Sequence, residues 1–92
     1  MAITFPYKDP DEYLDYTLDW SDRLVTDPIV SSNWSTPTPT GLTLVTATIA
    51  SFTTTVWLSD GTIGDVYQFT NRIETAAGRI MDQSVKIKIK AK

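Results

Sequence analysis

An all-β sandwich of about seven short antiparallel strands is the fold that the sequence predicts, for three reasons. Threonine, valine and isoleucine are abundant, and their β-branched side chains favour pleated strands. Apolar and polar residues alternate with period 2, and turn residues interrupt the alternation roughly every 8–12 residues. Finally, 92 residues without a linker or an internal repeat fit a single domain, 1–92.

The alternation is clearest toward the end of the chain. The last expected strand carries aliphatic residues on one face and lysines on the other: Val85, Ile87 and Ile89 against Lys86, Lys88 and Lys90. A strand over 67–74 precedes it, and the turn 76–78 joins the two as a hairpin. Another strand, over 53–59, ends at Asp60-Gly61, a strong turn signal.

The first half of the chain adds shorter strands over 16–20, 29–35 and 41–46. The segment 8–12 is turn-like and could hold one short helical turn. Residues 1–7 alternate Ile3, Phe5 and Tyr7, which indicates an extended segment. It forms either an arm that adds to a neighbouring subunit or the domain's own first strand, and the second is favoured.

One local feature refines the fold. Residues 64–69 have the layout of a tyrosine corner, in which the hydroxyl of Tyr67 bonds back to the chain at the preceding crossover. In this alignment with antibody domains, Phe69 takes the place of the second cysteine, Trp34 that of the buried tryptophan, and Leu18 that of the first cysteine. A surface tyrosine near a turn is the alternative. The sequence therefore predicts an immunoglobulin-like sandwich.

The composition excludes many catalytic sites. The chain has no histidine and no cysteine, which removes the commonest general base, the commonest metal ligand and any disulfide. A carboxylate pair such as Asp15 and Asp19 would lie on an exposed strand face, whereas glycoside hydrolysis needs a cleft. We therefore expect no enzyme and no cofactor. No apolar run approaches the roughly 20 residues of a membrane span, and the first residues do not resemble a signal peptide.

Clustered carboxylates in the first turn raise the question of calcium. The cluster comprises Asp9, Asp11, Glu12 and Asp15. Calcium takes 6–8 oxygen ligands, but the spacing does not match an EF-hand loop and no glycine supplies its sharp bend. Solvated turn carboxylates and no metal site are expected, with calcium binding left open as the alternative.

The charges are sorted along the chain, although the net charge is −3. Seven of the eleven acids lie within 9–27, and six of the eight basic residues lie from Arg72 onward. The lysine row could protect a sheet edge from aggregation, or it could meet the acidic surface, within one molecule or between copies. Binding to nucleic acid is disfavoured by the negative charge.

Candidate interface residues follow from exposure and chemistry. Trp57 alternates against Val56 and Leu58, which the pattern places inward. Trp57 then either projects outward, where an exposed tryptophan suits a binding hot spot, or faces inward at a sheet edge, and the sequence leaves both positions open. The full candidate set is Trp57, Lys86, Lys88, Lys90, Phe5 and Tyr7.

Several blocks of sequence, in order, carry a resemblance. They are Lys8-Asp9-Pro10-Asp11, Leu14-Asp15-Tyr16-Thr17 with Asp19-Trp20, Ile29-Val30-Ser31-Ser32-Asn33-Trp34, Thr55-Val56-Trp57-Leu58-Ser59-Asp60-Gly61 and Tyr67-Gln68-Phe69-Thr70-Asn71-Arg72-Ile73. Together they resemble the small immunoglobulin-like structural proteins of tailed bacteriophages, labelled fiber–tail adaptor or head–tail region proteins. The resemblance covers residues 8 to about 90.

This resemblance implies a virion component that is made in the host cytoplasm and present in several symmetric copies. Such a protein would dock at the neck or tail and connect to fibers or portal-region proteins, without nucleic acid or membrane. A capsid decoration protein with the same fold is the alternative, and copy number per particle separates the two. A minor regulatory or nucleic-acid-binding protein is a third hypothesis, which the net charge disfavours.

Overall fold

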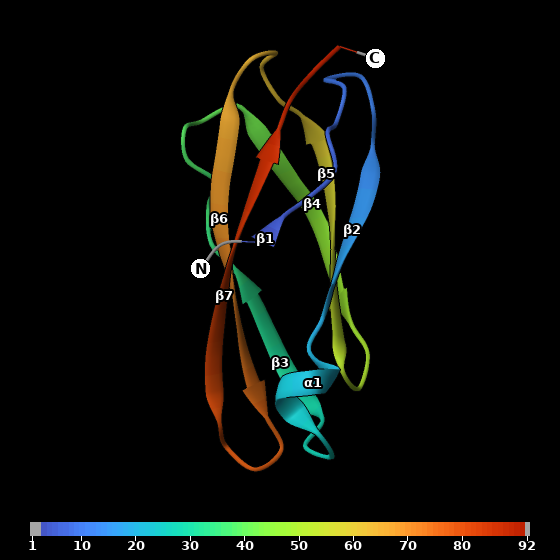
Figure 1. Ribbon diagram of the computed structural model, residues 1–92, viewed down its shortest axis with the longest axis vertical. Helices are drawn as coiled ribbons and strands as arrows, with labels where there is room; N and C mark the ends of the chain where they lie inside the picture. Colours follow the sequence, from blue (N-terminus) through green and yellow to red (C-terminus); the bar gives the residue numbers. More distant parts are fainter. Residues whose placement is uncertain (1–2, 92) are drawn as a thin grey trace.

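Two stacked β-sheets build the domain, for which the computed structural model describes residues 3–91 (Figure 1). Along this part of the chain the elements are β1 (Ile3–Thr4), β2 (Leu14–Asp19), α1 (Ser21–Leu24), β3 (Ile29–Trp34), β4 (Leu42–Ile49), β5 (Thr53–Asp60), β6 (Val66–Thr75) and β7 (Ile80–Lys88). The all-β sandwich of about seven strands is therefore confirmed.

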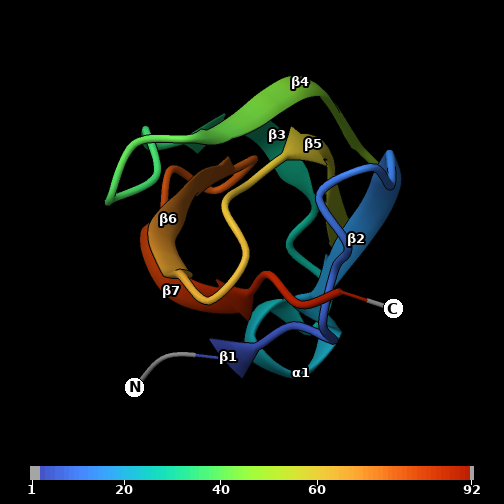
Figure 2. The same cartoon turned by 90° about the horizontal axis from the view of Figure 1, so that it is seen from above.

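The strands divide into a four-stranded sheet, β1-β7-β6-β3, and a three-stranded sheet, β2-β5-β4. Viewed along the strands, the two sheets enclose a common interior (Figure 2). Most neighbouring strands are antiparallel, as predicted, but β1 runs parallel to β7, with Ile3 opposite Val85. This parallel pair corrects the expectation of a wholly antiparallel sandwich.

The predicted tyrosine contact is confirmed at the turn before β6. Tyr67 is fully buried, and its hydroxyl accepts a hydrogen bond from the backbone N–H of Thr62 at 2.9 Å. Gly41 makes room for it, because a Cβ there would lie 2.7 Å from the hydroxyl. The strand orders β3-β6-β7 and β2-β5-β4 match the C-F-G and B-E-D orders of immunoglobulin domains. The immunoglobulin-like classification itself stays a prediction, which both observations support.

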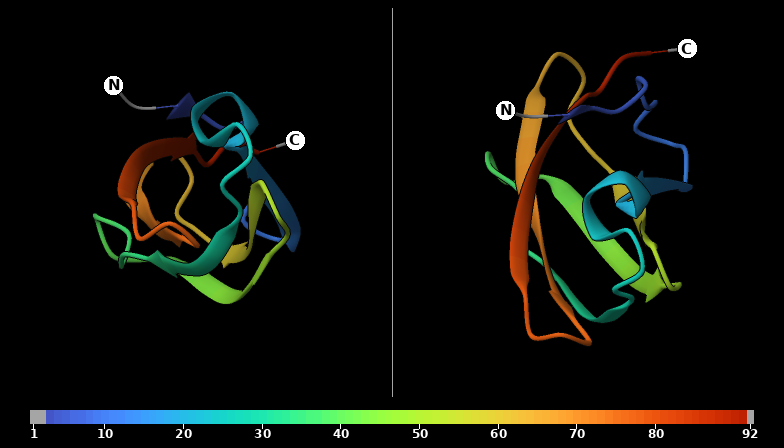
Figure 3. Two further views of the ribbon diagram at one scale, coloured as in Figure 1. Left: turned by 90° about the horizontal axis from the view of Figure 1, so that it is seen from below. Right: turned by 60° about the horizontal axis from the view of Figure 1, so that its bottom comes forward.

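The core occupies the space between the sheets and contains the three residues placed there by analogy with antibody domains. Leu18 and Phe69 are buried, and the half-buried Trp34 packs against Phe69 with a ring separation of 5.8 Å. α1 connects β2 of one sheet to β3 of the other (Figure 3). Trp20, directly before α1, and Leu24, within it, are buried in the core. Large buried rings give a small domain most of its burial per residue.

Local details differ from the sequence prediction at two places. The helical turn lies at Ser21–Leu24, directly after Trp20, whereas 8–12 holds a tight turn and a single bridge from Lys8 to Ile89. β4 continues to Ile49, three residues beyond its expected end, because a register shift at residue 45 lets it follow β5. Such a bulge bends a strand without ending its pairing.

Candidate assembly surfaces

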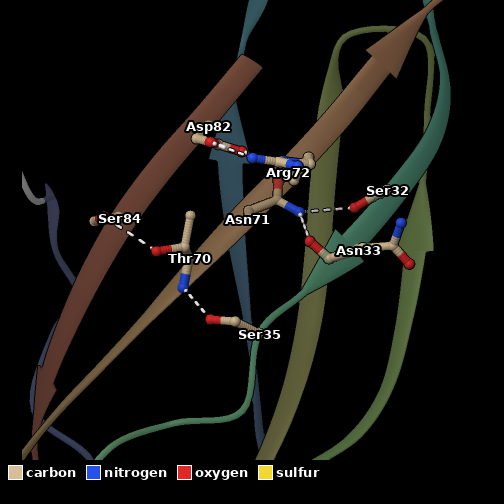
Figure 4. A network of polar contacts seen from close by, with 8 residues as sticks. All are labelled: Ser32, Asn33, Ser35, Thr70, Asn71, Arg72, Asp82 and Ser84. Atoms are coloured by element: carbon tan, nitrogen blue, oxygen red, sulfur yellow. Dashed lines mark hydrogen bonds and ion pairs between the residues drawn. The ribbon is translucent and has the colours of Figure 1, made fainter. Parts of the chain in front are cut away.

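A chain of hydrogen bonds, of which the first two are buried and the last two partly buried, crosses the interior and joins the two sheets. The indole N–H of Trp20 donates to the hydroxyl of Thr54 at 3.1 Å, and that hydroxyl donates to Oδ1 of Asn71 at 2.7 Å. Nδ2 of Asn71 then donates to Oγ of Ser32 at 2.8 Å and to the carbonyl of Asn33 at 3.1 Å (Figure 4). Because these inward polar groups bond to one another, they stabilise the core and are not free to bind a ligand.

Thr70, on the outward side of β6, makes different polar contacts, with Ser84 of β7 and with Ser35, directly after β3 (Figure 4). The hydroxyls of Thr70 and Ser84 are 3.1 Å apart, and Arg72 binds Asp82 through two hydrogen bonds of 2.8 and 3.0 Å. Hydrogen bonds from the guanidinium lower the pKa of the Asp82 carboxyl, whereas the same bonds raise the pKa of Arg72. This pair leaves the middle of the outer face locally neutral.

Lysines dominate the other end of this outer face. Lys86 and Lys88 are exposed on β7, while Val85 and Ile87 between and beside them are fully buried, as the alternation predicted. Lys90 follows the strand, and its Nζ lies 5.0 Å from the ring centroid of Tyr7. The two salt bridges within residues 3–91 are Arg72–Asp82 and Arg79–Asp27, so neither includes these lysines. We call Lys86, Lys88 and Lys90 the basic face.

Backbone pairing shows that the lysines do not line a free sheet edge. The N–H of Phe5 donates to the carbonyl of Lys86 at 2.8 Å, and the N–H of Lys8 donates to the carbonyl of Lys88 at 3.2 Å. The N–H of Lys90 donates in turn to the carbonyl of Lys8 at 2.8 Å. Since the N-terminal segment pairs along β7, the interpretation of these lysines as edge protection is wrong.

The two N-terminal interface candidates, Phe5 and Tyr7, differ in how far they are buried. Ile3 and Thr4 pair with β7 of the same chain. Phe5 is only 6% exposed and stacks on Tyr16, with ring centroids 4.9 Å apart. Its side chain belongs to the core, which corrects its place among the interface candidates. Tyr7, by contrast, is 50% exposed and remains available at the surface.

Trp57 lies on the outer face of the second sheet. It projects between the fully buried Val56 and Leu58 of β5, the middle strand, so an inward position at a sheet edge is excluded. Its ring lies 5.2 Å from that of Tyr13, which is 51% exposed. Sequence analysis missed Tyr13, although the alternation that exposes Asp15 extends back to it.

Two carboxylates share the face with this aromatic pair. Asp15 lies opposite Trp57 in the strand register, and Asp19 lies further along the same exposed side of β2. Between them, the hydroxyls of Thr17 and Thr55 are 2.9 Å apart. We call Tyr13, Asp15, Asp19 and Trp57 the acidic–aromatic face. The expectation that both aspartates lie on an exposed polar strand face is confirmed.

Lys8 has a role that the sequence did not indicate. Its side chain is fully buried, and its Nζ donates to the carbonyls of Asp9 at 2.9 Å and Asp60 at 2.7 Å. Burial lowers the pKa of Lys8, and the nearby carboxylates of Asp60 and Glu12 oppose that change. Lys8 therefore ties the first turn to the end of β5.

The acidic turn uses its carboxylates to hold its own backbone. Oδ1 of Asp9 accepts a hydrogen bond from the N–H of Asp11 at 2.8 Å, and Oε1 of Glu12 accepts one from the N–H of Asp9 at 2.9 Å. Asp15 lies on β2, on the outer face described above. Over residues 3–91, no three potential ligands among aspartate, glutamate, histidine and cysteine gather in the manner of a metal site.

In two of the surface hollows, oppositely charged residues of the lining pair with each other: Arg72 with Asp82, and Arg79 with Asp27. The one beside Trp34 has a volume of about 310 Å³ and includes the Arg72–Asp82 pair in its wall. In the part of the chain described, no helix has the length and apolar character needed to cross a bilayer. The available chemistry is that of two outer faces: one basic, the other acidic and aromatic.

Comparison with known proteins identifies the family. No curated protein matches the chain. A family model described as the podophage GP4 fiber-tail adaptor protein gp77 matches residues 8–88, a range that spans both sheets and most of both faces. The resemblance to phage fiber–tail adaptor proteins is thereby confirmed, and the chain belongs to the Gp77 family of fiber-tail adaptor proteins.

Proposed function

We propose that this protein is a non-enzymatic structural adaptor of a phage virion that docks at the tail and connects it to fibers. The observation that carries the proposal is the family match over residues 8–88. The sandwich supports it, because its interior is filled by a core and a closed polar network, whereas its two outer faces carry unlike chemistry.

The arrangement suits a docking module. Two sheets packed on one core give a scaffold whose outer faces can bind partners without refolding. The Trp57–Tyr13 pair offers a large apolar anchor of the kind found at binding hot spots. The basic face adds electrostatic complementarity, which sets specificity and register more than affinity.

The partners that follow are other structural proteins of the particle: neck, tail, fiber or portal-region proteins. Several symmetric copies would surround the tail, since oligomeric assemblies are usually symmetric. The protein would be made in the host cytoplasm and then incorporated in the virion. Neither a cofactor nor nucleic acid nor a membrane has a part in this mechanism.

Disruption of the gene tests the proposal. Particles produced without the protein should retain heads and tails but lack fibers, and expression of the protein in trans should restore them. Electron microscopy counts the fibers, and mass spectrometry measures the fiber protein against the major capsid protein. A full complement of fibers on particles without this chain would contradict the proposal.

Copy number separates the adaptor from the capsid-decoration alternative. Quantitative mass spectrometry of purified particles should find a few to a few dozen copies of the chain, in proportion to the tail proteins. Hundreds of copies, in proportion to the capsid protein, would favour decoration of the head instead.

A further inference from the structure

We propose that copies of this chain bind one another head to tail, with the basic face of one copy on the acidic–aromatic face of the next. The inference deepens the proposed function, on which it rests for its place in the particle. It concerns a second copy of the chain as partner, and it is argued from the position and chemistry of the two faces.

Among residues 3–91, no salt bridge joins the basic face to the acidic–aromatic face of the same molecule. Lys86 and Lys88 lie on the outer side of the β1-β7-β6-β3 sheet, whereas Asp15 and Asp19 lie on the outer side of the β2-β5-β4 sheet. The two sheets lie on opposite sides of the core (Figure 2), so these residues lie on the outer sides of different sheets. Of the two contacts considered from the sequence, within one molecule or between copies, the proposal takes the second.

Neighbouring charges strengthen the contrast between the faces. Asp82, the acid on β7, is neutralised by Arg72, so it does not offset the lysines. Arg23, the basic residue nearest to β2 in sequence, lies in α1 and packs over the ring of Trp20, 4.8 Å from its centroid. Opposite charges on two surfaces favour encounter between them and disfavour contact between like faces.

The chemistry of the two rows is complementary in detail. Residues two apart on one face of a strand are separated by about 7 Å, as Lys86 and Lys88 are on β7 and Asp15 and Thr17 are on β2, and Tyr13 directly precedes β2. An ammonium group can lie against the Trp57–Tyr13 pair while its neighbour pairs with Asp15. The geometry of a lysine over an aromatic ring already occurs in this molecule, where Lys90 lies over Tyr7.

The dimensions permit such a contact. The molecule measures 41 × 22 × 19 Å, so each broad face is large enough for the roughly 800 Å² that one partner buries in a specific interface. Because the two patches differ, the contact is heterologous, and repeated contacts close into a ring or continue as a filament. Either arrangement leaves the ends of every sandwich open to other proteins.

Sedimentation velocity of the purified chain tests this inference. The wild-type protein should form assemblies larger than a dimer as its concentration rises, and added salt should weaken them by screening the charges. The double variants Lys86→Ala/Lys88→Ala and Asp15→Asn/Trp57→Ala should each associate at least tenfold more weakly. Circular dichroism confirms that they fold, and Glu74→Gln, on β6 at the far end from the lysines, should associate like wild type.

Mixing the two variants gives the decisive result. Each retains one intact face, so together they should form a one-to-one dimer that does not grow. A wild-type chain that stays monomeric at every concentration, or a mixture that does not pair, would overturn the inference. Loss of fibers from gene-disrupted particles would be unaffected by that outcome, so the two proposals fail separately.

Discussion

The two sides of β6 lie in opposite surroundings, although they belong to the same ten residues of backbone. The inward side is buried and carries Tyr67, Phe69, Asn71 and Ile73. The outward side is mostly exposed and carries Gln68, Thr70, Arg72 and Glu74. The inward residues hold the sheets together, whereas the outward ones contribute only surface contacts. Folding and binding can therefore be altered independently, by substitutions one residue apart.

The largest expected effect comes from the apolar part of the inward side. Ile73→Ala removes a fully buried side chain and leaves a cavity, so the free energy of unfolding should fall by about 2–5 kcal/mol. The neighbouring Arg72→Ala removes an exposed ion pair and should change stability far less. Urea unfolding of both variants measures the difference in stability. Equal losses of stability would contradict the distinction between the two sides of β6.

The buried polar network is expected to come second. Asn71→Ala leaves the hydroxyl proton of the buried Thr54 without its acceptor, although that hydroxyl still accepts from Trp20, and the loss should cost about 1–3 kcal/mol. Gln68→Ala, on the outward side of the same strand, serves as the matched control. If the urea concentration at the midpoint of unfolding were the same for Asn71→Ala as for the wild type, the network would not stabilise the sandwich.

A smaller loss is expected from the tyrosine at the start of β6. Tyr67→Phe keeps the ring in the core but removes the acceptor for the N–H of Thr62, which should lower stability by about 1 kcal/mol. Tyr13→Phe, with an exposed ring on the outer face, should leave the melting temperature unchanged. Equal melting temperatures for both variants would contradict the structural role of the Tyr67 hydroxyl.

The smallest predicted effect is one of pH. Burial lowers the pKa of Lys8 in the folded chain below the usual 10.5 that it has in the unfolded chain. At a pH between the folded and the unfolded pKa, the unfolded chain therefore binds more protons than the folded chain. The free energy of unfolding should therefore rise as the pH increases through that window. Lys8→Met should lack this rise.

Subtraction isolates the effect of Lys8 from other titrations. Burial raises the pKa of Tyr16, whose contribution changes in the opposite direction at high pH, but it is common to both proteins. Unfolding measured at several alkaline pH values gives the difference between wild type and Lys8→Met. Parallel pH profiles would show that Lys8 does not titrate differently on folding.

Local alternation predicted the best-defined parts of the molecule. Between β5 and β7, successive residues point to opposite faces, so period 2 alone identified the buried Val56, Ile73 and Val85 and the outward Lys86. The tyrosine corner was also predictable, because its residues are close in sequence. Several blocks of sequence in the right order were enough to indicate the phage family.

Long-range pairing determined what the sequence could not show. Ile3, Phe5 and Tyr7 alternate, yet β1 lasts only two residues, so Phe5 enters the core while the other two remain exposed. The same pairing removes β7 from the edge and buries Lys8 beneath Asp60. None of these positions follows from the local pattern, because each depends on a partner about 50 or more residues away.

Incorporation of a folded surface variant into particles tests the separation of folding from assembly most directly. Lys86→Glu/Lys88→Glu reverses two exposed charges on the basic face and leaves Val85 and Ile87 in place. Its thermal unfolding should match that of the wild type, while mass spectrometry should find it depleted from purified particles. Normal incorporation of this variant would contradict the account.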